Sequence, residues 1–178
     1  MHRRVIGSGS SDKIQVISLG IGGDTSTGVL SRFDDETVPR ISAKWLLVIV
    51  IAIGTNDSRM KDGVIETLPD QFRNNLTTII EKARRYTQDI LLVDLPPMAD
   101  DVVQFGEKQY TNERIAEYAQ IVKGVAKEEG LAFADLGEKF VKTDANLFYE
   151  DSLHPSDAGH EIIMEIVSDW FERLVFEE

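Results

Sequence analysis

The chain has 178 residues, of which 42% are hydrophobic and 28% charged, a composition typical of a globular protein rather than a disordered one. It has no cysteine, which excludes disulfide frameworks, Cys-ligated zinc, iron–sulfur clusters and a cysteine nucleophile. The formal net charge of −12 argues against nucleic acid as a partner, because a nucleic-acid binder needs a basic face.

Four segments have the composition of β-strands, namely residues 13–19, 45–53, 89–95 and 131–136. The second, WLLVIVIAI, is apolar on both faces and indicates a central strand of a parallel sheet that is covered on both sides. Its nine residues are too few for a membrane helix, which needs about twenty, so no membrane span is expected. No apolar signal region follows the basic N-terminus, and we expect a cytoplasmic protein.

Helical periodicity separates these strands. One helix is expected to begin near Thr25, a second has its apolar stripe over residues 68–83, a third is capped by Thr111, and a fourth lies near the C-terminus. The alternation predicts an α/β fold in which a mainly parallel sheet lies between two helical layers. The sequence has no repeat and no linker, so residues 1–178 are interpreted as one domain with an irregular segment at residues 1–12.

Functional groups of such folds gather beyond the carboxyl ends of the strands. Residues 20–25 (GIGGDT) offer backbone N–H groups before a helix, although a plain turn explains glycines there as well. Residues 54–57 (GTND) contain Asn56, whose side-chain amide can donate a hydrogen bond to an oxyanion. A turn or capping role for Asn56 is an equal alternative.

Asp151 and His154 form a third signal, within the sequence DSLHP. A carboxylate beside an imidazole fixes its tautomer and leaves the other ring nitrogen to act as a general base. The other histidines are His2, at the terminus, and His160, which we expect on the surface of the last helix. His154 is therefore the strongest candidate for a base, against the alternative of a plain surface histidine. We interpret Ser152 as a spacer.

These three segments, in this order, resemble those of the SGNH hydrolase family, also called GDSL-type esterases and lipases, over roughly residues 13–175. The resemblance implies a three-layer, flavodoxin-like fold and hydrolysis of carboxylic esters or thioesters through a serine acyl-enzyme. It implies that Gly23 and Asn56 hold the oxyanion. It also implies that His154 is the base, that Asp151 orients it, and that no metal or organic cofactor takes part.

The family's first block, Gly-Asp-Ser, which carries the nucleophile, is not present in this sequence. Residues 5–7 (VIG) are similar to the strand that precedes it. The next strand follows too soon for a parallel crossover, which needs a dozen or more residues. Our first expectation is that a segment is missing between Gly7 and Asp12, because removal of a central strand should cost more than the few kcal/mol by which domains are stable.

Two alternatives stay open. One is that a serine of the Gly/Ser stretch is the nucleophile, with Ser8 better placed than Ser10 or Ser11, although a flexible linker is the more ordinary interpretation of that stretch. The other is a catalytically incomplete module that binds a ligand without turnover. A phosphate or flavin binder that uses residues 20–25 ranks last, because it gives the Asp–His pair no role.

The expected partner is a small-molecule ester or acyl substrate, whose identity the pocket decides. An incomplete sheet edge favours pairing with another chain, so a homo-oligomer fits the sequence. Met98 and the two prolines before it follow a predicted strand. We favour a rigid turn there over an acyl pocket.

Overall fold

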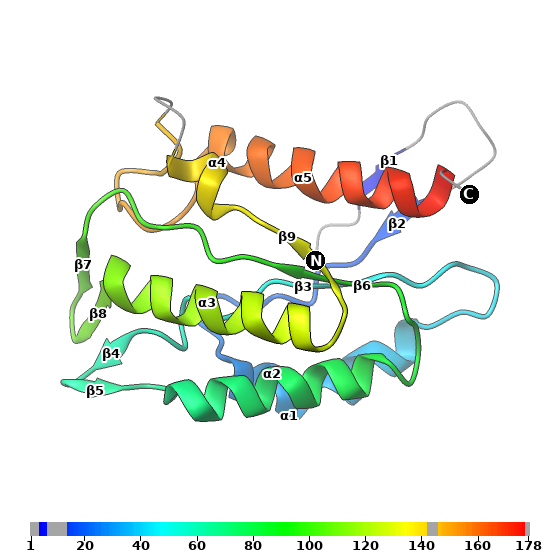
Figure 1. Cartoon of the computed structure of the whole chain (residues 1–178), viewed down its shortest axis with the longest axis horizontal. Helices are drawn as coiled ribbons and strands as arrows, with labels where there is room; N and C mark the ends of the chain where they lie inside the picture. The colour runs from blue at the N-terminus through cyan, green and yellow to red at the C-terminus, as the bar shows by residue number, and fades with distance from the viewer. Residues whose placement is uncertain (1–3, 7–13, 142–145, 177–178) are drawn as a thin grey trace.

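The computed structural model describes residues 4–6, 14–141 and 146–176. Its centre is a parallel sheet with the strand order β3 (Ile49–Ile51), β6 (Ile90–Val93), β9 (Ala132–Ala134). One face carries α1 (Ser26–Thr37), α2 (Pro69–Ala83) and α3 (Asn112–Glu128), and the other carries α4 (Gly137–Val141) and α5 (Asp157–Phe176) (Figure 1). The predicted α/β class, with a parallel sheet between two helical layers, is confirmed.

β6 is the central strand, and both of its faces are buried. Ile90 and Leu92 pack into one apolar cluster with α2 and α3, whereas Leu91 and Val93 pack into a second cluster with β9 and α5. Successive side chains of a strand point to opposite faces, so this continuous apolar run supplies both cores at once. Full burial of each such side chain contributes about 1.5–3 kcal/mol.

β3 lies at the edge of the parallel sheet, which corrects the prediction that residues 45–53 form a central strand. Its register with β6 pairs Ile49 with Ile90, and no described strand pairs with its other side. As a result Trp45, Leu46 and Val50 stay 56%, 60% and 46% exposed. Apolar residues on both faces indicate that helices cover a strand, but they do not indicate a partner along both of its edges.

The N-terminal strands lie outside the parallel sheet. β1 (Arg4–Ile6) and β2 (Ile14–Val16) pair with each other in antiparallel register, with Ile6 opposite Ile14. The expectation that residues 13–19 add a strand to the parallel sheet is therefore wrong. The reason is the short connection, which permits an antiparallel pair but not a parallel crossover.

A second, antiparallel sheet was not predicted. Its strand order is β5 (Val64–Ile65), β4 (Met60–Lys61), β8 (Lys108–Thr111), β7 (Val102–Phe105). It lies beyond the carboxyl ends of β3 and β6, at the left of Figure 1. We call it the accessory sheet, and Tyr110 on β8 contacts Asn56, one of the predicted site residues.

α1, α2 and α3 begin close to the predicted positions. α3 begins after Thr111, whose hydroxyl accepts the N–H of Arg114 at 3.3 Å, as a capping residue does. A short 3₁₀ helix, η1 (Val38–Arg40), follows α1. His160 on α5 is exposed, as predicted. None of the described helices is both long and apolar enough to cross a membrane.

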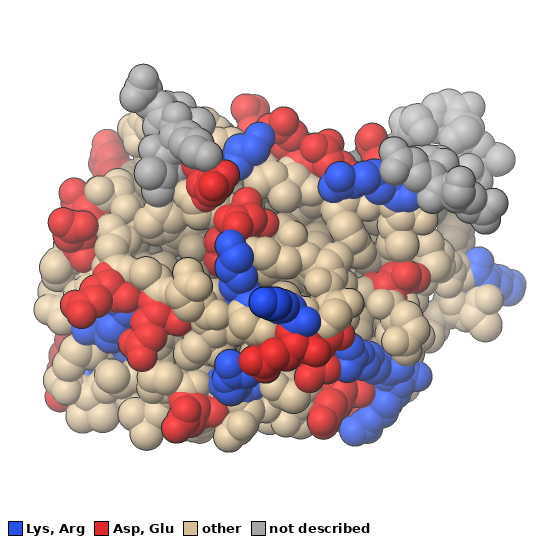
Figure 2. All heavy atoms as spheres, in the orientation of Figure 1, with Lys and Arg blue, Asp and Glu red and all other residues tan. Residues whose placement is uncertain are grey.

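Charged side chains of both signs are interspersed on the face drawn in Figure 2, where no continuous basic patch is visible. Several of the Lys and Arg side chains form ion pairs, including Arg73 with Glu128 at 2.7 Å and Lys123 with Asp135 at 2.9 Å.

Candidate active site

The Asp151 and His154 side chains contact each other on the loop between α4 and α5. Nδ1 of His154 lies 2.7 Å from Oδ2 of Asp151. Oδ1 of Asp151 accepts the backbone N–H groups of Leu153 at 3.0 Å and His154 at 2.9 Å. The hydrogen bond from the His154 N–H is the main cause that lowers the pKa of Asp151, so its carboxyl group stays ionised. An ionised carboxylate accepts a hydrogen bond from Nδ1–H, which leaves Nε2 as the basic nitrogen.

Ser152 lies between these two residues in the chain, and its hydroxyl has a partner other than the imidazole. Its backbone has φ +60°, in the left-handed region that is uncommon for residues other than glycine. Its hydroxyl donates to Oδ2 of Asp100 at 2.6 Å. This geometry fits a spacer. The His154 side chain itself is 67% exposed, so Nε2 can be reached by a substrate.

The His154 loop is anchored on the loop that follows β6. The N–H of Ala99 donates to the carbonyl of Ser152 at 3.0 Å. The next residue back, Met98, donates its N–H to Oδ1 of Asn112, at the start of α3, at 2.7 Å. These hydrogen bonds fix the position of the His154 loop relative to the parallel sheet.

Gly23 lies in a tight turn that precedes α1. The turn is closed by a hydrogen bond from the N–H of Asp24 to the carbonyl of Ile21 at 3.1 Å. Gly23 has φ +80°, the value that the third residue of a type II turn adopts and that favours glycine. Among the described residues, the N–H of Gly23 donates no hydrogen bond, which leaves it available for a ligand oxygen.

Asn56 lies in the turn after β3, and its amide is held on both sides. Nδ2 donates to the backbone carbonyl of Asp24 at 3.0 Å, which joins this turn to the glycine turn. Oδ1 accepts from the hydroxyl of Tyr110 at 3.1 Å and from Nη1 of Arg59 at 3.0 Å. The structure thus brings Asn56 next to Asp24, the residue that follows Gly23.

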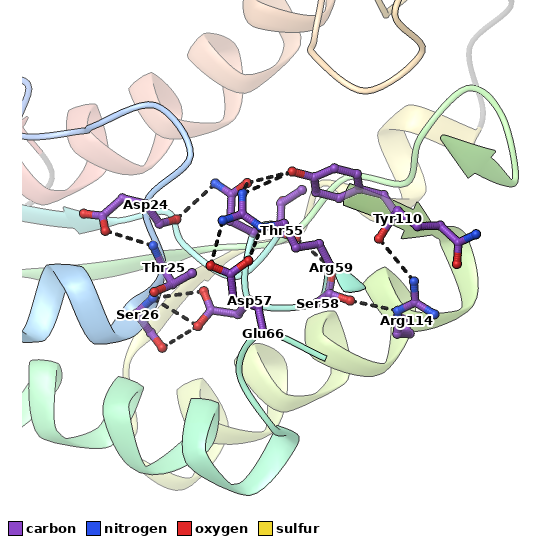
Figure 3. Close-up of polar contacts among 12 residues, drawn as sticks. Asp24, Thr25, Ser26, Thr55, Asp57, Ser58, Arg59, Glu66, Tyr110 and Arg114 are labelled. Carbon is purple, nitrogen blue, oxygen red and sulfur yellow. Dashed lines mark hydrogen bonds and ion pairs between the residues drawn. The ribbon is translucent and has the colours of Figure 1, made fainter. Parts of the chain in front are cut away.

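Asp57 also joins the Asn56 turn to the segment that follows the glycine turn. Its side chain is fully buried, and it accepts the N–H of Ser26 at 3.0 Å and the hydroxyl of Ser26 at 2.5 Å (Figure 3). Burial raises the pKa of Asp57, although its donors oppose the shift. The role of Asp57 is to hold the start of α1 against the Asn56 turn.

Arg59 and Tyr110 were not singled out as site residues in the sequence. Arg59 follows the GTND segment by two residues, and Tyr110 lies on β8, far along the chain. The signal that could have pointed to Arg59 is the Asp62-Gly63 pair, which is typical of a tight hairpin. That hairpin turns the chain back beside Asn56.

Ser8, the candidate nucleophile named from the sequence, lies outside the described residues, as do Ser10 and Ser11. Two described serines near Asn56 have other partners. The hydroxyl of Ser26 is bonded to Asp57, and that of Ser58 donates to the carbonyl of Thr55 at 2.8 Å. Both residues are buried, so neither is placed to attack a substrate.

A groove of about 580 Å³ runs along the open edge of β3. One of its walls belongs to α1, where Val29 and Phe33 contribute apolar surface, and Asn56 and Asp24 also line it. The N–H of Ile49 donates to the backbone carbonyl of Asp89, the residue before β6, at 3.0 Å. Main-chain groups alternate in direction along a parallel strand, so those of Val50 point into the groove.

A second cavity of about 370 Å³ lies between the loop that follows β6 and residues 146–148. Its walls include Pro97, Met98, Asn112 and Phe148. Met98 is buried at this wall, so the segment that we interpreted as a rigid turn also borders a cavity. Within the described ranges, no group of three or more His, Asp or Glu side chains is arranged to hold a metal ion.

A sequence model of the GDSL-like lipase/acylhydrolase family matches residues 3–162 of this chain. Esterase TesA of Pseudomonas aeruginosa is 27% identical over 156 residues, which cover 86% of this chain and 67% of that protein. A GDSL esterase/lipase of Arabidopsis thaliana is 25% identical over 181 residues, with 92% of this chain and 74% of that protein covered.

Solved structures show the same fold. A lipase/acylhydrolase from Enterococcus faecalis matches with a TM-score of 0.68 and 24% identity, over 85% of this chain and 71% of that one. A catalytic mutant of an acetylxylan esterase from Geobacillus stearothermophilus matches with a TM-score of 0.68 and 21% identity, over 88% of this chain and 71% of that one.

Proposed function

This chain belongs to the GDSL-like lipase/acylhydrolase family, and from this premise we propose that it hydrolyses carboxylic esters or thioesters through a serine acyl-enzyme. The observation that carries the proposal is the 2.7 Å contact between Nδ1 of His154 and Oδ2 of Asp151, on an exposed loop. The similarity to an esterase of Pseudomonas aeruginosa supports an ester as the substrate class.

In this mechanism Nε2 of His154 takes the proton of a serine hydroxyl while the serine oxygen attacks the acyl carbonyl carbon. Asp151 stabilises the imidazolium that forms. The carbonyl oxygen becomes an oxyanion, which accepts hydrogen bonds from the N–H of Gly23 and from Nδ2–H of Asn56. His154 then returns its proton to the departing alcohol or thiol, and the acyl group stays on the serine.

The second half repeats these roles with water. His154 takes a proton from a water molecule as the water oxygen attacks the acyl carbon. Collapse of the second oxyanion releases the acid, and the proton on His154 returns to the serine oxygen. The nucleophile in this proposal is a serine outside the described residues, and Ser8 is the first candidate.

A second function is a binding module on the same scaffold that holds an ester or acyl ligand without cleaving it. One observation favours it. Among the described residues, Asp151 is the only side chain that forms a hydrogen bond with the imidazole of His154, and no serine hydroxyl does so. Such a module would be stabilised against thermal unfolding by a ligand that it does not turn over.

A fluorophosphonate that labels activated serines distinguishes the two functions. We expect one adduct per chain, located by peptide mapping on a serine outside the described residues, and release of acid from a short p-nitrophenyl ester. His154→Ala should abolish both results. His160→Ala is the matched control, because His160 lies exposed on α5, and it should leave both unchanged. No adduct on the folded parental chain would contradict the hydrolase and favour the binding module.

A further inference from the structure

The hairpin of β4 and β5 lies directly after the Asn56 turn, and its geometry follows from two residues. Asp62 and Gly63 have φ values of +52° and +78°. Positive φ at both central residues defines a type I′ turn, whose twist matches that of two antiparallel strands. The turn sets the register in which Lys61 faces Val64 and Met60 faces Ile65.

One step further along this ladder, Arg59 faces Glu66. The N–H of Glu66 donates to the carbonyl of Arg59 at 3.0 Å, which continues the backbone pairing. Their side chains form a two-point ion pair, with Nη2 of Arg59 at 2.8 Å from Oε1 of Glu66 and Nε at 2.5 Å from Oε2 (Figure 3). A two-point pair fixes the plane of the guanidinium as well as its position.

The guanidinium is buried and has one nitrogen left for another partner. The Arg59 side chain is only 6% exposed, against 29% for Glu66. Nη1 points at Oδ1 of Asn56, at 3.0 Å, and lies 3.4 Å from the hydroxyl of Tyr110. The ion pair raises the pKa of Arg59 and lowers that of Glu66, so both groups stay charged.

These contacts determine the orientation of the Asn56 amide. Oδ1 accepts two hydrogen bonds, from Arg59 and Tyr110, and its acceptor capacity is two. Rotation of the amide by half a turn would place its NH₂ group against two donors. Nδ2 is therefore held toward Asp24, to whose carbonyl it donates one hydrogen, and its second hydrogen has no partner among the described residues.

We propose that Arg59 is a positioning residue that fixes the orientation of the Asn56 amide and strengthens its Nδ2–H as a donor to the reacting carbonyl oxygen. A cation at Oδ1 withdraws electron density from the amide, which makes the N–H groups more acidic and their hydrogen bonds stronger. Glu66 acts one step further out, because it orients Arg59. This assignment rests on the proposed role of Asn56 in holding the oxyanion.

A double-mutant cycle separates this role from a purely structural ion pair. We expect Arg59→Gln to lower kcat about tenfold, less than loss of an oxyanion donor itself, and to change KM little. In an Asn56→Ala background the same substitution should lower kcat no further, because the residue through which Arg59 acts is gone. The same tenfold loss in both backgrounds would overturn the proposal.

Two further variants test whether the effect is specific to these contacts. Arg73→Gln breaks an exposed Arg–Glu pair between α2 and α3, away from Asn56, and should leave kcat unchanged. Glu66→Gln leaves Arg59 in place but weakens its orientation, and we expect a loss smaller than that of Arg59→Gln. An effect of Glu66→Gln as large as that of Asn56→Ala would contradict the proposal that Glu66 acts on Asn56 only through Arg59.

Nuclear magnetic resonance tests the contact between Arg59 and Asn56 without turnover. This test can be made whether or not the chain is an active hydrolase. The Asn56 side-chain NH₂ signals are assigned by their loss in Asn56→Ala. In Arg59→Gln these signals should move and broaden, because the amide can now rotate, whereas Arg73→Gln should leave them in place. Unmoved Asn56 signals in folded Arg59→Gln would refute the positioning role, and absent turnover with moved signals would refute only the hydrolase.

Discussion

The hydroxyl of Tyr110 lies 3.1 Å from Oδ1 of Asn56, although 54 positions separate the two residues in the chain. They belong to different sheets, since Asn56 follows β3 of the parallel sheet and Tyr110 lies on β8 of the accessory sheet. The contact therefore joins the accessory sheet to the candidate oxyanion site, and the Arg59 hairpin adds a second contact from the same sheet.

Tyr110→Phe removes one of the two donors to Oδ1 of Asn56 while the ring keeps its place. We expect it to destabilise the fold by about 1 kcal/mol in urea unfolding, because one half-buried hydrogen bond is lost. We also expect kcat for a short ester to fall by less than in Arg59→Gln, since the uncharged donor is the weaker one. Tyr149→Phe is the control, because it removes an exposed hydroxyl that bonds to Asp157. Equal effects of the two variants would contradict a role for Tyr110.

Asp151→Asn tests the orientation of His154. An amide oxygen can still accept the two backbone N–H groups, so the loop should keep its shape, but the negative charge beside the imidazole is lost. We expect kcat to fall by about 10³–10⁴-fold. Rates within about threefold of the parental chain would exclude Asp151 as the partner of the base.

The same variant has a predictable pH dependence of stability. The pKa of Asp151 is lowered in the folded protein, mainly by the His154 N–H. The carboxylate therefore stabilises the fold above the ordinary pKa of Asp, and this contribution disappears as the pH falls through the lowered value. The difference in urea midpoint between the parental chain and Asp151→Asn should shrink from about pH 5 to pH 3. A difference that grows toward low pH would contradict the sign.

Asp57→Ala should destabilise the fold by about 2–3 kcal/mol, because the buried N–H and hydroxyl of Ser26 would lose their acceptor. Asp35→Ala on the exposed side of α1 is the control and should be near neutral. Burial raises the pKa of Asp57, so its contribution is largest at low pH and falls as the pH rises through the raised value. The effect of Asp57→Ala should be larger near pH 4 than near pH 7 in urea titrations.

Val50→Lys tests the open edge of β3. A row of unpaired main-chain groups beside apolar side chains favours edge-to-edge pairing, and a lysine on an edge strand opposes it. We expect the parental chain to self-associate with concentration in sedimentation velocity and Val50→Lys to shift it toward the monomer. Met164→Lys places the same charge at an exposed residue of α5 and should leave association unchanged. Identical association of all three proteins would mean that β3 is not the contact.

The sequence predicted the elements whose side chains repeat with a strong period. α2 was expected over residues 68–83 and spans Pro69–Ala83, because Phe72, Leu76 and Ile79 share one buried face. The position of β3 was predicted wrongly. An apolar run indicates that both faces of a strand are covered. A partner along the edge of the strand depends on main-chain hydrogen bonds, which do not require a particular type of side chain.

The accessory sheet was missed for a different reason. Its strands are two to four residues long, and they include Lys61, Lys108 and Gln109, so they lack both an apolar run and a clear alternation. Asp151 and His154 were found because their contact is local in sequence. The contact of Asn56 with Tyr110 depends on the packing of two sheets, and a single sequence does not report it.

The unequal surroundings of β3 and β6 should give these strands different dynamics. Every residue of β6 is buried between two partner strands and two helical layers. The Val50 N–H of β3 instead faces the groove. In deuterium exchange, the β6 amides should open only when the whole molecule unfolds, and Val50 should exchange through small local fluctuations. The parallel sheet is then stable at its centre and locally flexible along its β3 edge, the strand that precedes Asn56.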